Sequence, residues 1–214
     1  MENIQSTEGI DIEFDILEEG CGLMVSEPAV RDLDALLEDL SFLHGTGFIR
    51  QLKEIASHPS FYFVKGETNI YSTGGENSED YENLLNAARK AVSHGFIVYI
   101  LPNPKNFRSA DFIFVRKGVY RLFDLKTIIG KNSVGNRLKE SIGQSNRVLL
   151  NLTCDYNIRN LTVEIKRYFE MNLSANEVLV FTGNKEISIK RNIATSKGFL
   201  KMMMNSFKNR VGGK

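Results

Sequence analysis

The sequence predicts an α/β protein in which helices flank a central mixed sheet, with an acidic, mostly helical appendage at the N-terminus. Three observations lead to this prediction. Helical and extended hydrophobic patterns alternate from about residue 79 onward in the order α-β-β-β-α-β-α-β-β-α. The 214 residues are 42% hydrophobic, which is enough to bury the core of a domain. No apolar run approaches the roughly 18 residues of a membrane-spanning helix.

The N-terminal part of the chain is acidic, because residues 1–45 contain twelve Asp and Glu residues against one Arg. Leucines at helical intervals predict an amphipathic helix within residues 29–42, and a weaker helix is expected from Gly47 to Ala56. A short strand at FYFVKG and a loop at YSTGGENS are expected next. We therefore divide the chain into an N-terminal segment, residues 1–59, and an α/β domain, residues 60–214.

From about Glu79 the α/β domain continues with a helix that Ser78 caps, that carries an apolar stripe and that ends at Gly95. The buried strand FIVYILP follows, and ADFIFVR and VYRLFDLKT are expected to form a hairpin around Lys117 and Gly118. The remaining elements are a helix from about 133 to 146, the strand RVLLNL, a helix from about 158 to 170, the strands EVLVFT and ISIKR, and a terminal helix.

The formal net charge of +1 conceals an uneven distribution of charge along the chain. Residues 46–214 contain 26 basic and 14 acidic residues, so this part is strongly positive. A basic body favours a polyanionic partner such as nucleic acid, although solvated helix faces also account for such charges. The acidic residues 1–45 either cover the basic part of the same chain or bind another protein.

The two cysteines, Cys21 and Cys154, have no CxxC or CxxxH spacing, so neither a zinc site nor a disulfide framework is predicted. The opening residues, MENIQSTEGIDIEFD, lack the basic and apolar regions of a signal peptide. We therefore expect a cytoplasmic protein without a membrane partner, which is compatible with delivery as part of a larger system.

Three charged residues are expected on one face of the hairpin. Alternation along VYRLFDLKT places Asp124 and Lys126 on the same side of the strand. A turn centred between Lys117 and Gly118 places Asp111 opposite this end of the strand. Two neighbouring carboxylates repel each other unless a cation compensates their charge. The group is therefore either a site for Mg²⁺ or Mn²⁺, which prefer oxygen ligands, or a buried ion pair between Asp and Lys.

Asp111, twelve intervening residues and then Asp124-Leu125-Lys126, in this order of helices and strands, resemble the PD-(D/E)xK nuclease superfamily. More narrowly, GFIVYILPNP, ADFIF, FDLKT and RLKESIGQSNRVLLNL resemble the nuclease domains at the C-termini of contact-dependent inhibition and related polymorphic toxins, and similar domains of phage and mobile-element proteins. The resemblance covers about residues 76–152. It implies a restriction-endonuclease-like fold and hydrolysis of phosphodiester bonds in RNA, such as tRNA, or in DNA.

The resemblance also implies roles for individual residues. Asp111, Asp124 and the backbone carbonyl of Leu125 are expected to bind Mg²⁺ or Mn²⁺, and Lys126 is expected to be the catalytic lysine. Ala110 stands where the motif usually has a proline, which is a minor departure.

The superfamily often adds a glutamate from the first helix of this region, and here we favour Glu82 over Glu79 and Glu76. Gln144 either reaches the site, as a glutamine does in many relatives, or caps the end of its helix together with Asn146. The basic residues expected to contact the nucleic-acid backbone, unless they only face solvent, are Lys131, Arg137, Lys139 and Arg147.

These observations predict a divalent-metal-dependent endonuclease that acts on nucleic acid and has a protein inhibitor or carrier as a further partner. The alternative is a non-catalytic module with a nuclease-like fold that binds nucleic acid or a phage or mobile-element protein. A third interpretation is an adaptor that binds a protein through the acidic helix and the methionine-rich C-terminal helix. Metal binding separates the first interpretation from the other two.

Overall fold

The structure is a computed structural model that describes residues 30–75, 80–104, 107, 109–130 and 133–208. From Arg31 onward, the described residues belong to one compact unit. No described helix combines the length and the hydropathy that crossing a bilayer requires.

The described part of the chain contains eight strands and seven helices. The strands are β1 (Tyr62–Phe63), β2 (Ile70–Ser72), β3 (Ile97–Ile100), β4 (Phe112–Arg116), β5 (Val119–Ile128), β6 (Arg147–Leu152), β7 (Glu177–Thr182) and β8 (Lys185–Lys190). The helices are α1 (Leu33–Asp39), α2 (Gly45–Ala56), α3 (Tyr81–Ser93), α4 (Val134–Glu140), α5 (Ile158–Met171), α6 (Arg191–Ala194) and α7 (Phe199–Lys208).

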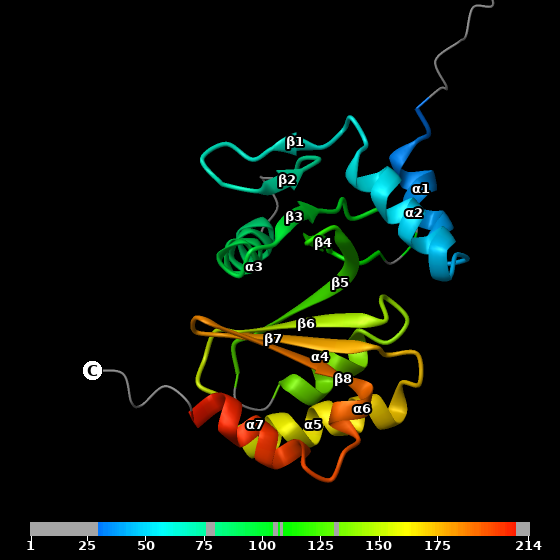
Figure 1. Ribbon diagram of the computed structural model, residues 1–214. Coiled ribbons are helices and arrows are strands. Elements are labelled where there is room, and N and C mark those ends of the chain that lie inside the picture. Colours follow the sequence, from blue (N-terminus) through cyan, green and yellow to red (C-terminus); the bar gives the residue numbers. More distant parts are fainter. Residues whose placement is uncertain (1–29, 76–79, 105–106, 108, 131–132, 209–214) are drawn as a thin grey trace, which may run out of the picture. The chain divides into compact units, whose positions relative to one another are not determined.

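The strands form one mixed sheet whose spatial order follows the order of the chain from β1 to β8 (Figure 1). The pairs β2–β3, β5–β6 and β6–β7 are parallel, and the other neighbouring pairs are antiparallel. Each parallel pair is joined by a crossover helix, namely α3, α4 and α5 in turn. The structure thus confirms the predicted α/β class, and the succession α3-β3-β4-β5-α4-β6 is consistent with a restriction-endonuclease-like fold.

The hairpin of β4 and β5 has the predicted register, with Phe112 opposite Phe123 and Arg116 opposite Val119. Lys117 and Gly118 form its two-residue turn, and both have positive φ angles, of 52° and 73°. Such a turn matches the right-handed twist of the flanking strands. The turn therefore fixes which residues of the two strands face each other.

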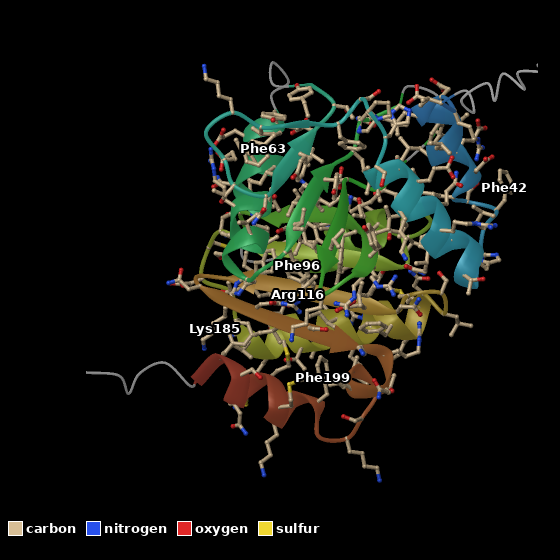
Figure 2. The ribbon with its side chains drawn as sticks, turned by 45° about the horizontal axis from the view of Figure 1, so that its top comes forward. Phe42, Phe63, Phe96, Arg116, Lys185 and Phe199 are labelled. Atoms are coloured by element: carbon tan, nitrogen blue, oxygen red, sulfur yellow. The ribbon has the colours of Figure 1, made fainter. Side chains whose placement is uncertain are left out.

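Strand β5 changes its pairing partners along its length. Its first half, up to Phe123, pairs antiparallel with β4, and its second half, from Asp124, pairs parallel with β6. In Figure 1, β5 accordingly runs from the part of the sheet that contains β1 to β4 into the part that contains β6 to β8. A second link between these parts is the bidentate ion pair from Arg116 of β4 to Glu186 of β8, with Arg116 also stacked 4.0 Å over the ring of Phe96 (Figure 2).

Helices cover both faces of the sheet. On one face, α3 packs against β3 to β7 through a cluster that includes Ala88, Phe114 and Leu149. On the other face, α1 and α2 cover β4 and the start of β5, whereas α4, α5 and α7 cover β6 to β8. The sequence prediction of helices in the N-terminal segment is thus confirmed for α1 and α2, while the proposed domain boundary near residue 60 stays a prediction.

Several elements match the prediction closely. RVLLNL and EVLVFT are strands β6 and β7 in full, and Gly95, with a φ of 82°, follows the end of α3 as expected. The prediction of a loop at YSTGGENS is wrong for its first two residues, Tyr71 and Ser72, because they belong to strand β2, which is parallel to β3. The helix expected up to about residue 146 ends at Glu140, and Gly143 has a φ of 88° that no α-helix accommodates.

Candidate active site

The candidate site lies where β5 changes partners, and it interrupts an otherwise apolar face. Leu122 packs in the cluster under α1 and α2, and Ile128 packs in the cluster under α4 and α5. Because alternate residues of a strand share a face, Asp124 and Lys126 lie between these two apolar positions. Both are largely covered, since Asp124 is 2% exposed and the Lys126 side chain is 13% exposed. The face thus holds two charged groups between two packed cores.

Asp111 reaches this point from the opposite strand. It directly precedes β4, and its backbone N–H donates over 3.0 Å to the carbonyl of Phe123, the residue of β5 that also faces Phe112. Its carboxylate Oδ2 accepts a hydrogen bond of 2.6 Å from the backbone N–H of Leu125. The three residues that the sequence analysis placed on one face of the hairpin are therefore close together in the structure.

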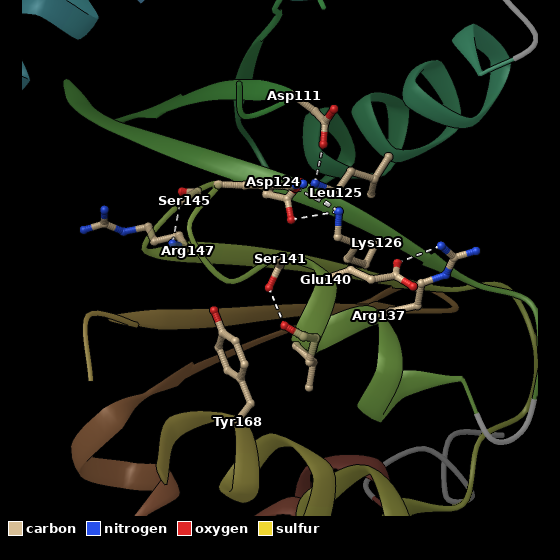
Figure 3. A network of polar contacts seen from close by, with 12 residues as sticks. Asp111, Asp124, Leu125, Lys126, Arg137, Glu140, Ser141, Ser145, Arg147 and Tyr168 are labelled. Carbon is tan, nitrogen blue, oxygen red and sulfur yellow. Dashed lines mark hydrogen bonds and ion pairs between the residues drawn. The ribbon is translucent and has the colours of Figure 1, made fainter. Parts of the chain in front are cut away.

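Lys126 connects Asp124 with the loop that follows α4. Its Nζ donates to Oδ1 of Asp124 over 3.0 Å (Figure 3) and to Oε1 of Gln144 over 3.1 Å. Oδ2 of Asp124 is also 3.0 Å from Nζ, but it is not aligned for a hydrogen bond and remains buried without a hydrogen-bond partner. Gln144 thus contacts the site from a position beyond the end of its helix.

Burial makes the ionised form of both carboxylates costly. Desolvation raises the pKa of Asp124 to about 7, with a further contribution from the neighbouring charge of Asp111 and an opposing one from Lys126. Desolvation also raises the pKa of Asp111, although the hydrogen bond from Leu125 and the charge of Lys126 act against this shift. A single lysine therefore compensates the two acids only in part.

The residues present fit a divalent cation. Asp124 Oδ2 is a buried carboxylate oxygen without a hydrogen-bond partner, next to a second carboxylate, and hard cations take oxygen ligands. The N–H and C=O of a strand residue point to the same side, so the carbonyl of Leu125 faces the edge where Asp111 accepts its N–H. Among the described residues, no group of three or more Asp, Glu, His or Cys side chains forms a metal cluster. The protein would supply two carboxylates and a carbonyl, which suits Mg²⁺, a cation that usually retains several waters.

A cavity of about 400 Å³ opens in front of these groups. Asp111, Leu125 and Lys126 line it, together with Asp80 and Arg137. The charge of Asp80 contributes to the raised pKa of Asp111. The sequence analysis did not single out Asp80, although its place directly before α3, on the helix expected to supply an acid, was an available signal.

The structure does not bring every predicted residue to this cavity. Glu82 is exposed on α3 and pairs with Arg89 over 2.8 Å, away from the two aspartates. Lys139 lines a different cavity, between α4 and α5. Arg137 lines the active-site cavity and pairs with Glu140 over 2.9 Å.

The remaining predicted residues fall into two groups. Arg147 lies at the start of β6, where its Nε is 3.3 Å from a carboxylate oxygen of Glu177. Lys131, Glu76 and Glu79, together with the predicted cap Ser78, lie outside the described residues.

The comparison with known families gives one match. Residues 114–187 match the family model described as the contact-dependent growth inhibition CdiA C-terminal domain. The matched range contains Asp124, Lys126 and Gln144 but not Asp111, and it covers less than half of the chain. This match supports the resemblance to C-terminal toxin domains, whereas membership of the wider PD-(D/E)xK superfamily stays a prediction. No curated protein and no solved structure matches the chain.

Proposed function

We propose that the chain is a divalent-metal-dependent endonuclease that hydrolyses phosphodiester bonds in RNA or DNA. The observation that carries this proposal is the pairing of two covered carboxylates, Asp111 and Asp124, beside a lysine that Gln144 holds in place. One oxygen of Asp124 is buried 3.0 Å from the ammonium of Lys126 without an aligned hydrogen bond, so a bound cation would add a contact to it. The cavity beside these groups gives a phosphodiester a place to bind.

In this proposal Asp111, Asp124 and the carbonyl of Leu125 hold the cation, Mg²⁺ or Mn²⁺. When bound, such a cation supplies positive charge to a phosphodiester and makes water more acidic. The N–H of Leu125 orients Asp111 through the hydrogen bond of 2.6 Å. Lys126 uses two of its three donors on Asp124 and Gln144, so one donor remains for a phosphate oxygen in the cavity.

We further propose that the chain acts as a toxin effector domain, which the match to the CdiA C-terminal domain supports. A toxin of this kind needs a protein inhibitor in the cell that makes it and a carrier for its delivery. The toxin resemblance favours tRNA or another structured RNA as the substrate. Duplex DNA is the substrate to compare it with, because the chemistry of the site does not depend on the sugar.

A second candidate function is a non-catalytic module that binds nucleic acid or a protein of a phage or mobile element. The observation that favours it is that, among the described residues, no third acidic side chain lies close enough to Asp111 and Asp124 to share a metal ion with them, although Asp80 lines the same cavity. Such a module has no need of a cation between its aspartates. Metal binding therefore discriminates between the two candidates.

The test is a calorimetric titration of Mn²⁺ into the protein and into Asp111→Asn, followed by incubation of both with labelled tRNA and duplex DNA. An asparagine at position 111 still accepts the N–H of Leu125, so the fold should persist while one metal ligand is lost. We expect the variant to lose Mn²⁺ binding and at least about a hundredfold in cleavage rate, as transition-state charge stabilisation is worth that much.

The matched control is Asp155→Asn, which makes the same chemical change at an exposed position. It should bind Mn²⁺ and cleave like the unmodified protein. Absence of Mn²⁺ binding by the unmodified protein would refute the proposal and favour the non-catalytic module.

A further inference from the structure

A second cavity lies apart from the two aspartates. It has a volume of about 930 Å³ and runs between α2 and the start of β6. Its lining includes Arg50 and Lys53 of α2, Arg147 of β6, and Asn146 and Asn176 from the loops before β6 and β7. Three of these side chains are basic, two are amides, and no Asp or Glu is among the residues that line it.

The positive charge of this cavity is only partly compensated. Arg147 lies 3.3 Å from Glu177, so its charge is shared with a buried carboxylate. Arg50 and Lys53 are exposed, and within the described residues neither makes an ion pair. The Nζ of Lys53 lies 5.8 Å from the ring centroid of Tyr120, a contact that leaves its three N–H donors available. The cavity therefore offers two uncompensated cations to a ligand.

A middle cavity of about 560 Å³ lies between this place and the candidate active site. It shares Gly45, Phe48 and Asn146 with the basic cavity. With the active-site cavity it shares Ser109 and Ala110, the two residues directly before Asp111. Gln144, which accepts a hydrogen bond from Lys126, also lines the middle cavity. The three cavities thus lie next to one another, in a row from Asp111 and Lys126 to Arg50 and Lys53.

We propose that this series of cavities is a groove for a nucleic-acid strand, and that Arg50 and Lys53 bind the phosphate backbone of the substrate away from the bond that is cleaved. The inference rests on the proposed nuclease function and adds a binding subsite to it. Phosphate contacts of this kind position a strand without reading its sequence. RNA and DNA share the phosphodiester chemistry that the two side chains recognise.

Binding through phosphates releases counterions, so it has a characteristic salt dependence. The slope of log K against log salt concentration is about −0.7 for each phosphate neutralised on a single strand and about −0.9 on duplex DNA. Removal of two such contacts should make the slope less steep by about 1.4 to 1.8 and weaken binding by about tenfold at moderate salt. Cleavage chemistry does not enter this measurement if it is made in EDTA.

The experiment compares the full chain with the double variant Arg50→Gln, Lys53→Gln by fluorescence anisotropy in EDTA, over a series of salt concentrations. The probes are tRNA, single-stranded DNA and duplex DNA. The control is Lys197→Gln, Lys201→Gln, which removes the same charge at exposed positions in and before α7. We expect weaker binding and a less steep salt dependence of binding in Arg50→Gln, Lys53→Gln, and neither change in the control. The probe whose binding weakens most then identifies the substrate class.

Equal losses in both double variants would show a general effect of net charge and would overturn the groove, as would unchanged binding in the first variant. Because metal is absent, these outcomes do not depend on whether the protein cleaves. If the protein binds nucleic acid through Arg50 and Lys53 but does not bind Mn²⁺, the subsite is supported and the proposed catalysis is refuted. The two proposals can therefore fail separately.

Discussion

Asp124 is the residue of the candidate site that is expected to lower the stability of the fold most. It is 2% exposed, has an oxygen without a hydrogen bond, and faces a second carboxylate. A hydrophobic residue at this position would join the cores that contain Leu122 and Ile128. A buried carboxylate that lowers stability is expected where a ligand or a reaction needs it.

The first prediction concerns the pH dependence of stability without metal. The pKa of Asp124 is raised to about 7, so between about pH 4 and pH 7 the unfolded chain has lost a proton that the folded chain still holds. A rise in pH over this window therefore favours the unfolded state. Asp124→Asn has no such proton to lose and should avoid this loss of stability. The difference in free energy of unfolding, Asp124→Asn minus unmodified protein, should therefore increase by on the order of 2 kcal/mol from pH 4 to pH 7.

Urea denaturation in EDTA at several pH values measures this difference. The exposed substitution Asp155→Asn provides the reference, and its pH profile should follow that of the unmodified protein. A difference between Asp124→Asn and the unmodified protein that stays constant with pH would contradict the raised pKa.

At the scale of elements, the turn of the β4–β5 hairpin determines the register that brings Asp111 beside Phe123 and Leu125 of β5. Gly118 has a φ of 73°, in the left-handed region, and a Cβ built on it would meet no atom within 4 Å. Its substitution by alanine therefore tests backbone strain alone. We expect Gly118→Ala to lower the free energy of unfolding by about 1–2 kcal/mol.

Gly47 offers a matched comparison, because its φ is not positive and a Cβ there would meet only the side chain of Leu43, at an ordinary distance of 3.8 Å. It lies inside α2, where alanine is the better helix former, so Gly47→Ala should raise the free energy of unfolding by up to about 1 kcal/mol. Chemical denaturation of the two variants side by side gives the result. Equal losses at both positions would show that the turn is not strained by a side chain.

The elements and residues that could be predicted from the sequence are those fixed by local pattern. Strands β6 and β7 are continuous apolar runs, and the register of the hairpin follows from its short turn. Strand β2 was missed because its three residues show no alternation and their pairing with β3 is a long-range contact. Asp80 was missed and Glu82 favoured because the direction in which the first turn of α3 faces depends on packing.

At the scale of the whole molecule, charge is separated along the chain. Residues 1–29 contain eight acidic and no basic residues, so their removal changes the formal net charge from +1 to +9. We expect the shortened chain to bind tRNA and duplex DNA about tenfold more tightly at low salt, because long-range repulsion of the polyanion is removed. The gain should disappear near 1 M salt, where the Debye length is about 3 Å.

Anisotropy titrations of the full and shortened chains provide the measurement. A full-length chain in which the eight acids are replaced by Asn and Gln should behave like the shortened one if charge is the cause. The same affinity for all three proteins at low salt would remove the idea that the acidic segment restrains binding.

Strand β5 takes part in both portions of the sheet, and this has a consequence for when the site exists. Asp111 arrives with β4, the carboxylate of Asp124 lies at the point where β6 takes over the pairing, and the partner of Lys126 comes from the loop after α4. The two aspartates come together once the β4–β5 hairpin has formed, whereas Gln144 reaches Lys126 only when the loop after α4 has packed beside β5. A chain in which only the hairpin has formed therefore holds both aspartates together while the contact that Gln144 makes with Lys126 is still missing.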